Sequence, residues 1–175
     1  MIKRIALIVV AALIAVLAYV ALQPPSFRLE REASIQAPPE TIFALISDFH
    51  RWSVWSPWEE TDPNLKRTYS GPDSGQGAVY AWEGNEEMGE GRMEIIEATS
   101  PSRVVIKLDI LEPFEGHNTA EFTLRPEGNS TRVNWAMYGR NTFMGKLMSV
   151  FIDIDSMVGK QFEAGLAALK RAAEG

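Results

Sequence analysis

The stretch VVIKLDILEPFEGHNTAEFTLRPEGNSTRVNWAMY, residues 104–138, decides the fold of this chain, because it reads as three consecutive strands joined by short turns. Apolar and polar side chains alternate in each strand, as in a sheet with one buried face and one solvated face. Glu127-Gly128-Asn129 is typical of a hairpin turn. We therefore expect antiparallel neighbours whose inward positions are Val104, Ile106, Leu108, Ile110, Ala120, Phe122, Leu124, Val133, Trp135 and Met137.

Further strands lie on the N-terminal side of this stretch. Residues 27–36 alternate in the same way, and residues 65–71, 78–82 and 91–98 are short runs bounded by turn-forming residues. The turn at residues 71–75 is Gly-Pro-Asp-Ser-Gly, and residues 84–87 form another. The count reaches about seven strands, and their short connections predict an antiparallel meander.

Helical patterns flank the strands. A helix opens at Ala37-Pro38-Pro39-Glu40, where proline is tolerated in the first turn. Residues 143–154 are predicted to be helical, and Asp155 or Ser156 is expected to cap the final helix. That helix is long enough to cover the apolar face of the sheet, which predicts an α+β domain. Its apolar stripe is Val158, Phe162, Leu166 and Leu169.

The N-terminus carries an apolar segment, Ile5 to Leu22, without a charged residue. Its eighteen residues would span roughly 27 Å as a helix, close to the thickness of a bilayer core. Because Lys3 and Arg4 precede it, residues 1–4 are expected to stay cytoplasmic, with the domain on the periplasmic or extracellular side of a bacterial-type inner membrane. We divide the chain into a cytoplasmic N-terminus (1–4), a transmembrane helix or signal anchor (5–22), a linker (23–26) and a globular domain (27–175).

A cleaved signal peptide is the alternative for this segment. Val16-Leu17-Ala18 loosely fits the small-residue rule for cleavage. The apolar run continues past Ala18, however, and is longer than the apolar region of a usual signal peptide. Its length favours an uncleaved anchor.

The composition excludes several classes of function. The 175 residues contain no cysteine, so disulfides, thiol nucleophiles and iron–sulfur clusters are excluded. The net charge of −6 disfavours nucleic-acid binding. With two histidines and no recognisable phosphate-binding loop, nucleophile elbow or zinc-protease motif, the sequence predicts no catalytic residues, no metal site and no cofactor.

One region carries a resemblance to a known family. Residues 35–49, IQAPPETIFALISDF, followed by WSVWSPW at residues 52–58, resemble the opening of polyketide cyclase/dehydrase-like proteins of the START/Bet v 1-like (SRPBCC) superfamily. Residues 75–85, the Gly-Glu-Gly at 89–91 and residues 141–170 fit the same family, so the likeness covers roughly residues 27–171. It implies a helix-grip fold, in which a curved antiparallel sheet wraps around a long C-terminal helix with a cavity between them. The superfamily contains lipid carriers, other binders and cyclases, so the fold does not fix the function.

We expect the cavity to be lined by aromatic residues and adaptable methionines. The alternative is a solid core, and the tryptophans at 52, 55 and 58 fit either a cavity mouth or a plug at one end of the sheet. The expected lining comprises Trp55, Tyr80, Trp82, Met93, Leu108, Ile110, Phe122, Trp135, Met137, Met148, Phe151 and Met157.

Three functions remain open at this point. The leading hypothesis is a membrane-tethered, non-enzymatic domain that binds a hydrophobic or amphipathic small molecule, with lipid as one class. An enzyme of the polyketide cyclase or dehydratase type would require His117 or Tyr80 to face a buried carboxylate in the cavity. A protein-interaction module would present a contiguous apolar patch at Trp55, or dock a protein on the acidic face of the sheet. The sequence identifies neither the ligand nor the oligomeric state.

Overall fold

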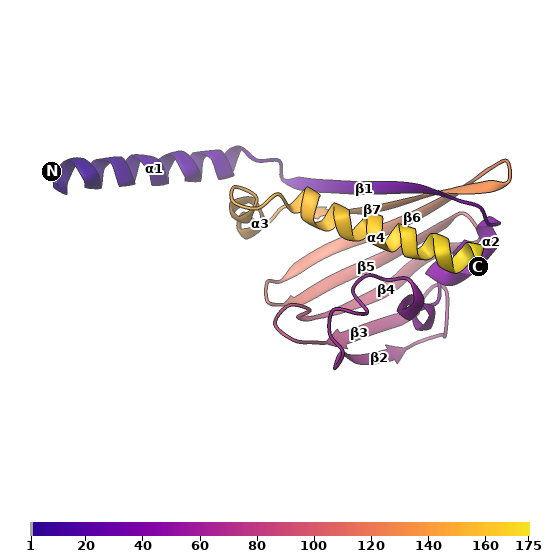
Figure 1. Cartoon of the computed structure of the whole chain (residues 1–175). Coiled ribbons are helices and arrows are strands. Elements are labelled where there is room, and N and C mark those ends of the chain that lie inside the picture. The colour runs from indigo at the N-terminus through magenta and orange to yellow at the C-terminus, as the bar shows by residue number, and fades with distance from the viewer. Residues whose placement is uncertain (1) are drawn as a thin grey trace.

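A computed structural model describes residues 2–175 of the chain (Figure 1). Met1, the first residue of the predicted cytoplasmic segment, lies outside the described residues. The elements, in chain order, are α1 (Ile2–Leu22), β1 (Ser26–Ile35), α2 (Pro39–Ile46), the 3-10 helix η1 (Phe49–Val54), β2 (Lys66–Ser70), β3 (Val79–Glu83), β4 (Glu90–Thr99), β5 (Arg103–Glu112), β6 (Gly116–Glu127), β7 (Ser130–Arg140), α3 (Phe143–Met148) and α4 (Ile154–Glu174).

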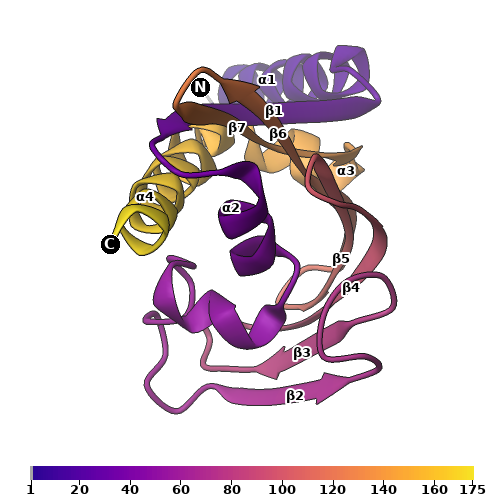
Figure 2. The ribbon, with the colours of Figure 1, turned by 90° about the vertical axis from the view of Figure 1, so that its right-hand side faces the viewer.

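The strands form one seven-stranded sheet in the order β1-β7-β6-β5-β4-β3-β2, and every neighbouring pair is antiparallel. Strands β2 to β7 follow one another as a meander, and β1 joins the sheet beside β7. Figure 2 shows the sheet curving around α2 and α4, which lie on its concave side. The predicted α+β helix-grip fold is therefore confirmed.

The concave face is apolar because the strands alternate as the sequence predicts. Phe122 on β6 lies opposite Trp135 on β7, and Leu29 on β1 lies opposite Met137. The convex face carries ion pairs instead; for example, Arg103 bridges Glu97 and Glu121, each at 2.7 Å. A sheet with one face in water needs this division.

Two helix predictions near the C-terminus are corrected. The helical segment predicted for residues 143–154 ends at Met148, and residues 149–153 form turns that lead into α4. The Ser149 hydroxyl donates to the Lys146 carbonyl at 2.8 Å, which helps to close the last turn of α3. The cap of α4 is Asp153, whose side chain accepts a bond from the Ser156 amide at 3.0 Å, rather than Asp155 or Ser156.

Helix α4 is fixed to the edge strand β1 by Arg31. The guanidinium contacts the Glu163 carboxylate at 3.0 Å and the Asp155 carboxylate at 3.1 Å. It passes so close to Gly159 that any side chain at that position would collide with it. A glycine in the first half of α4 therefore allows an arginine of the sheet to cross the helix.

Helix α1 extends away from the domain (Figure 1). Within residues 2–175 it is the one helix that is long and apolar enough to cross a membrane. A signal sequence would meet the same criteria of length and composition. Almost all of its side chains are exposed; Val20, near its C-terminal end, is buried.

Candidate functional site

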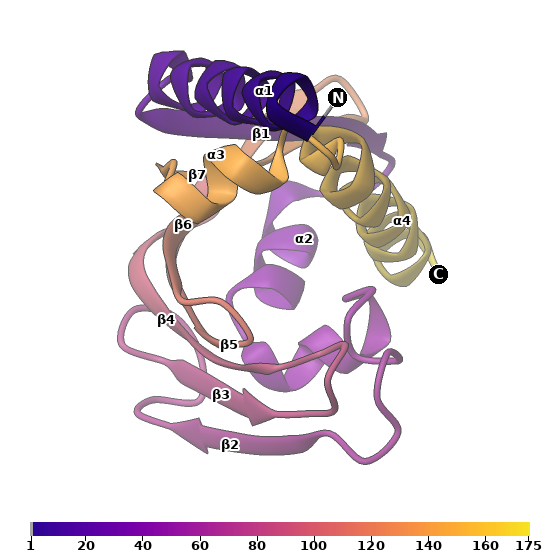
Figure 3. The same cartoon turned by 90° about the vertical axis from the view of Figure 1, so that its left-hand side faces the viewer.

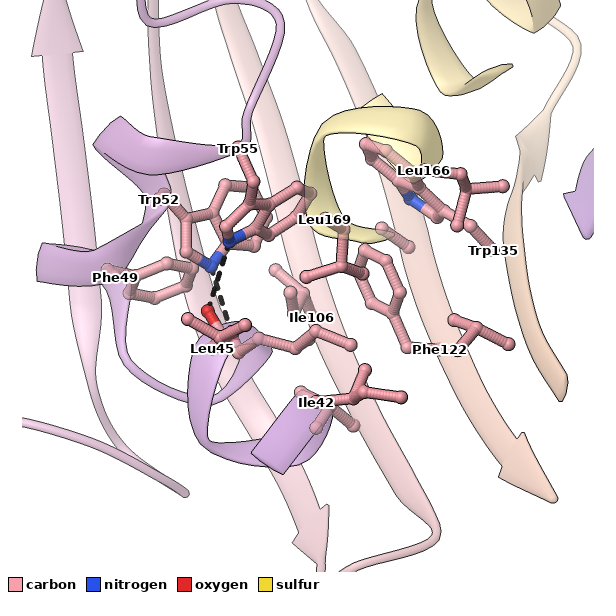
Figure 4. Close-up of a cluster of buried hydrophobic side chains, with 14 of the residues drawn as sticks. Ile42, Leu45, Phe49, Trp52, Trp55, Ile106, Phe122, Trp135, Leu166 and Leu169 are labelled. Carbon is pink, nitrogen blue, oxygen red and sulfur yellow. Dashed lines mark hydrogen bonds between the residues drawn. The ribbon is translucent and has the colours of Figure 1, made fainter. Parts of the chain in front are cut away.

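At the end of the concave face where α2 lies, the buried side chains of Trp52 and Trp55 pack against α2, and we call this the closed end (Figure 4). The Trp52 indole donates to the Ile46 carbonyl at 2.9 Å, and the Trp55 indole donates to the Leu45 carbonyl at 3.1 Å. Both acceptors belong to the last turn of α2, where carbonyls lack partners within the helix. The two tryptophans thus fix η1 against α2 and act as a plug.

Aromatic side chains also fill the middle of the space. The Trp135 ring stacks on Phe162 of α4, with centroids 4.1 Å apart and planes 7° apart. Phe122 of β6 also stacks with Trp135, with centroids 4.8 Å apart. A Cβ at Gly165 would lie only 2.8 Å from the Trp135 ring, so this glycine permits the close approach of α4. The middle of the predicted cavity is therefore packed with side chains.

The opposite end is less completely covered, and we call it the open end. Leu108 and Ile110 on β5 and Met137 on β7 point inward and pack against the core, yet they are only half-buried. Asn118 of β6 lies among them, opposite both Leu108 and Gly139. Its side-chain oxygen would be 2.5 Å from a Cβ at Gly139, so the amide lies against that glycine. The open end thus combines apolar walls with one uncharged polar group.

The wall on the β3–β4 side is built on another glycine. The Trp82 ring lies over Gly91 of β4, where any side chain would collide with it, and its indole nitrogen donates to the Met88 carbonyl at 3.3 Å. Met93, the next inward residue of β4, is buried. These residues form part of the core wall.

The predicted lining residues fall into three groups. Six are buried in the core: Trp55, Tyr80, Trp82, Met93, Phe122 and Trp135. Four are half-buried near the open end: Leu108, Ile110, Met137 and Met148. Phe151 and Met157 are exposed, so their expected position between sheet and helix is corrected. Phe151 lies in the turns before α4, and Met157 lies in the first turn of α4.

A cleft of about 460 Å³ lies in this same region. It is lined by residues 149–155, the turns between α3 and the start of α4. The Asn141 amide donates to the Pro25 carbonyl at 2.9 Å, which ties the start of this segment to the beginning of β1. The cleft therefore lies at the end of the domain from which α1 departs.

A polar cluster around Tyr80 lies beside the aromatic core, and its carboxylate, Glu59, was not identified from the sequence. The Tyr80 hydroxyl donates to Glu59 Oε1 at 2.8 Å, and Arg67 Nε contacts Glu59 Oε2 at 2.7 Å. The Glu59 side chain is 6% exposed. Burial, together with the hydrogen bond to this carboxylate, raises the pKa of Tyr80 well above its usual value. Glu59 escaped prediction because it is 21 residues from Tyr80 and lies in an irregular segment.

His117 lies on the solvated convex face. Its Nδ1 is 2.7 Å from Asp109 and its Nε2 is 3.2 Å from Glu115. The hydrogen bond to Asp109, aided by the one to Glu115, raises the pKa of His117. Within residues 2–175 no three His, Asp or Glu side chains form a group that could hold a metal ion. His117 is thus separated from the concave space by the sheet.

Comparison with known folds agrees with this architecture. The chain is similar to the Aha1 dimer from Colwellia psychrerythraea, with a TM-score of 0.61 and 17% identity over 85% of this chain and 96% of that one. It is also similar to Ara h 8.0201, with a TM-score of 0.55 and 11% identity over 86% and 96% of the two chains. At such identities these likenesses concern the fold alone.

A third similar structure is BexL, a di-domain ARO/CYC protein from the BE-7585A biosynthetic pathway. The TM-score is 0.62 at 15% identity, and the match covers 91% of this chain and 53% of BexL. This chain therefore spans about half the length of that protein.

Comparisons of sequence give one match. None of the curated proteins matches the chain. One family model, described as polyketide cyclase / dehydrase and lipid transport, matches residues 26–174. The match runs from the first residue of β1 to the last residue of α4 and so includes the whole sheet. The chain belongs to the polyketide cyclase/dehydrase and lipid transport family.

Proposed function

We propose that this protein binds a hydrophobic or amphipathic small molecule, of which a lipid is one class, at the open end of its concave sheet, without catalysis. The observation that carries the proposal is the contrast between the two ends of one apolar face. The closed end is sealed by Trp52 and Trp55, whereas Leu108, Ile110 and Met137 keep part of their surface uncovered. A ligand that covered them would gain roughly 25 cal/mol for each Å² removed from water.

The chemistry of this end suits such a ligand. Ligand pockets are mostly apolar with a few polar groups that set orientation, and Asn118 offers an amide donor and acceptor among the aliphatic side chains. The cleft at residues 149–155 adds space at the same end. The family description includes lipid transport, which agrees with an apolar ligand.

The proposal places α1 across a membrane as a single span. Lys3 and Arg4 precede its apolar part, so the domain is assigned to the periplasmic or extracellular side of a bacterial-type inner membrane. Tethering would keep the open end close to lipids and to other molecules that partition into the bilayer, and so raise their effective concentration.

Native mass spectrometry of the full chain, released from detergent micelles, tests the proposal. We expect a mass excess that disappears on denaturation and that identifies the ligand class. Ile110→Gln should abolish the excess, because it places an amide on the inner wall of the open end. Leu111→Gln is the matched control, because Leu111 is the next residue of β5 and is exposed. Equal retention of ligand by both variants, or a bare mass for the wild type at saturating lipid, would exclude binding at this end.

One observation favours a second candidate function, catalysis on an aromatic substrate. Tyr80 faces the buried carboxylate of Glu59, which is the polar pair that such an enzyme requires. The Glu59 carboxylate is also paired with Arg67, however, and Tyr80 is only 2% exposed. A substrate therefore reaches Tyr80 and Glu59 only if residues 56–62 move. Glu59→Gln distinguishes the two roles: a structural pair predicts lower stability with the ligand still bound, whereas a catalytic pair predicts loss of turnover.

A further inference from the structure

The most unusual surface of the domain lies on residues 143–157. Two of its members, Phe143 and Phe151, are 58% and 75% exposed, although aromatic side chains of this size are normally buried. We define the anchor-end patch as the exposed side chains Phe143, Met144, Phe151, Ile152 and Met157. Contiguous exposed apolar surface marks sites where a protein meets another molecule or a membrane.

The position of α1 indicates what the anchor-end patch contacts. Helix α3 is in contact with α1, and Figures 1 and 3 show it beside the C-terminal end of α1. The Lys146 ammonium donates to the Gln23 carbonyl at 2.9 Å, directly after α1 ends. Val20, in the last turns of α1, is fully buried. The patch therefore begins at the level where α1 ends.

This level is close to the boundary of a bilayer if α1 spans it. The apolar part of α1, Ile5 to Leu22, extends roughly 27 Å, close to a hydrocarbon core of about 30 Å. Three residues, 23–25, separate α1 from β1, and a fully extended chain of that length covers at most about 10 Å. The domain cannot retreat far from the membrane, and α3 remains beside the helix end.

The tip of the β5–β6 hairpin lies at the same end. Asn118 near the start of β6 pairs with Gly139 near the end of β7, and Ser26 at the start of β1 pairs with Arg140. The turn between β5 and β6, residues 113–115, therefore lies at the end of the domain from which α1 departs, and its Phe114 side chain is exposed. Two separate segments of the chain expose aromatic side chains where α1 departs.

We propose that the anchor-end patch docks onto the bilayer surface beside α1, with Phe151 and its neighbours at the boundary between headgroups and acyl chains. The inference rests on the proposed membrane placement of α1. The segment that carries the patch has charges of both signs, Lys146, Asp153 and Asp155, so burial of apolar surface rather than attraction to anionic lipid provides the binding energy. The docked patch holds the cleft at residues 149–155 against the lipid.

Site-specific fluorescence in phosphatidylcholine liposomes tests this docking with the full chain. Because the protein has no cysteine, Phe151→Cys provides a unique site for an environment-sensitive label. Ile96→Cys is the matched control, since Ile96 is an exposed apolar residue on β4. It lies five residues, or about 16 Å, along the strand from Gly91, which pairs with Ile110 near the anchor end. Leu13→Cys, in the middle of α1, reports whether that helix is in the bilayer.

We expect the label at position 151 to shift to the blue and to be quenched by nitroxide-labelled phosphatidylcholine, while the label at position 96 shows neither effect. If position 13 is quenched and position 151 is not, the docking is excluded while the membrane placement stands. If neither is quenched, the placement fails, and the docking with it. A blue shift at position 151 without lipid quenching indicates that a second protein copy covers the patch, which also overturns the inference.

Discussion

Substitution of Trp55 by phenylalanine tests whether this residue belongs to the core or to a ligand-binding mouth. Trp55 is 2% exposed and packs against Trp52, Phe122 and Trp135. The smaller ring leaves the Leu45 carbonyl without its donor, which costs about 1–3 kcal/mol for a buried acceptor. It also leaves about 40 Å³ of space, worth roughly 1 kcal/mol at the measured dependence on cavity volume. The expected loss is about 2–4 kcal/mol.

Urea unfolding of the full chain in mild detergent, followed by far-ultraviolet circular dichroism, measures this loss. With a slope of about 2 kcal/mol per molar urea, the midpoint should fall by about 1–2 M. Trp58→Phe is the control, because Trp58 is half-buried and a phenylalanine can keep its edge-on contacts with Trp135 and Phe162; it should lose about 1 kcal/mol or less. The core assignment would be refuted if Trp55→Phe were no more destabilising than the control but lost binding of the apolar ligand.

Two further predictions concern the sheet. Gly91→Ala should destabilise the domain by about 1–3 kcal/mol in the same titration, because the new methyl group collides with the Trp82 ring; Gly116→Ala, which meets nothing closer than 3.7 Å, should cost clearly less. The raised pKa of His117 means that its protonated form is stabilised by folding, so this contribution is full below the unfolded value of about 6.5 and disappears as the pH rises through the higher folded value. The stability difference between wild type and His117→Asn should therefore shrink from pH 6 to pH 8, and a difference independent of pH would contradict the assignment.

The sheet was predictable because each strand carries its own signal. Alternation in residues 104–138 identifies β5, β6 and β7 and the face that each buries, since the side-chain period of a strand is two residues. The early proline pair and the apolar stripe of residues 158–169 similarly identify α2 and α4. The structure of residues 143–154 was harder to predict, and the helix there ends at Met148. Apolar residues at helical spacing indicate a buried helix face, but here several of them are exposed.

The site was only partly predictable. Ten of the expected lining residues are at least half-buried, but their type alone does not separate those that fill the core from those that remain uncovered. Leu108 and Ile106 look alike in sequence; Ile106 is buried because it lies further from the open end. Phe151 was assigned to the interior on its hydrophobicity, although it is exposed.

The sequence by itself determined the strands, the α+β class and the apolar N-terminal helix, because these depend on local periodicity, turn residues and the length of an apolar run. Tertiary structure alone decided that Trp52 and Trp55 bond to the end of α2, that Glu59 meets Tyr80, and that α3 contacts α1. The tryptophan bonds span only six and ten residues, but they depend on how η1 folds back on α2. The other two relations join residues 21 or more positions apart, and they follow from how the sheet curves and where its ends fall, which no local pattern of side chains encodes.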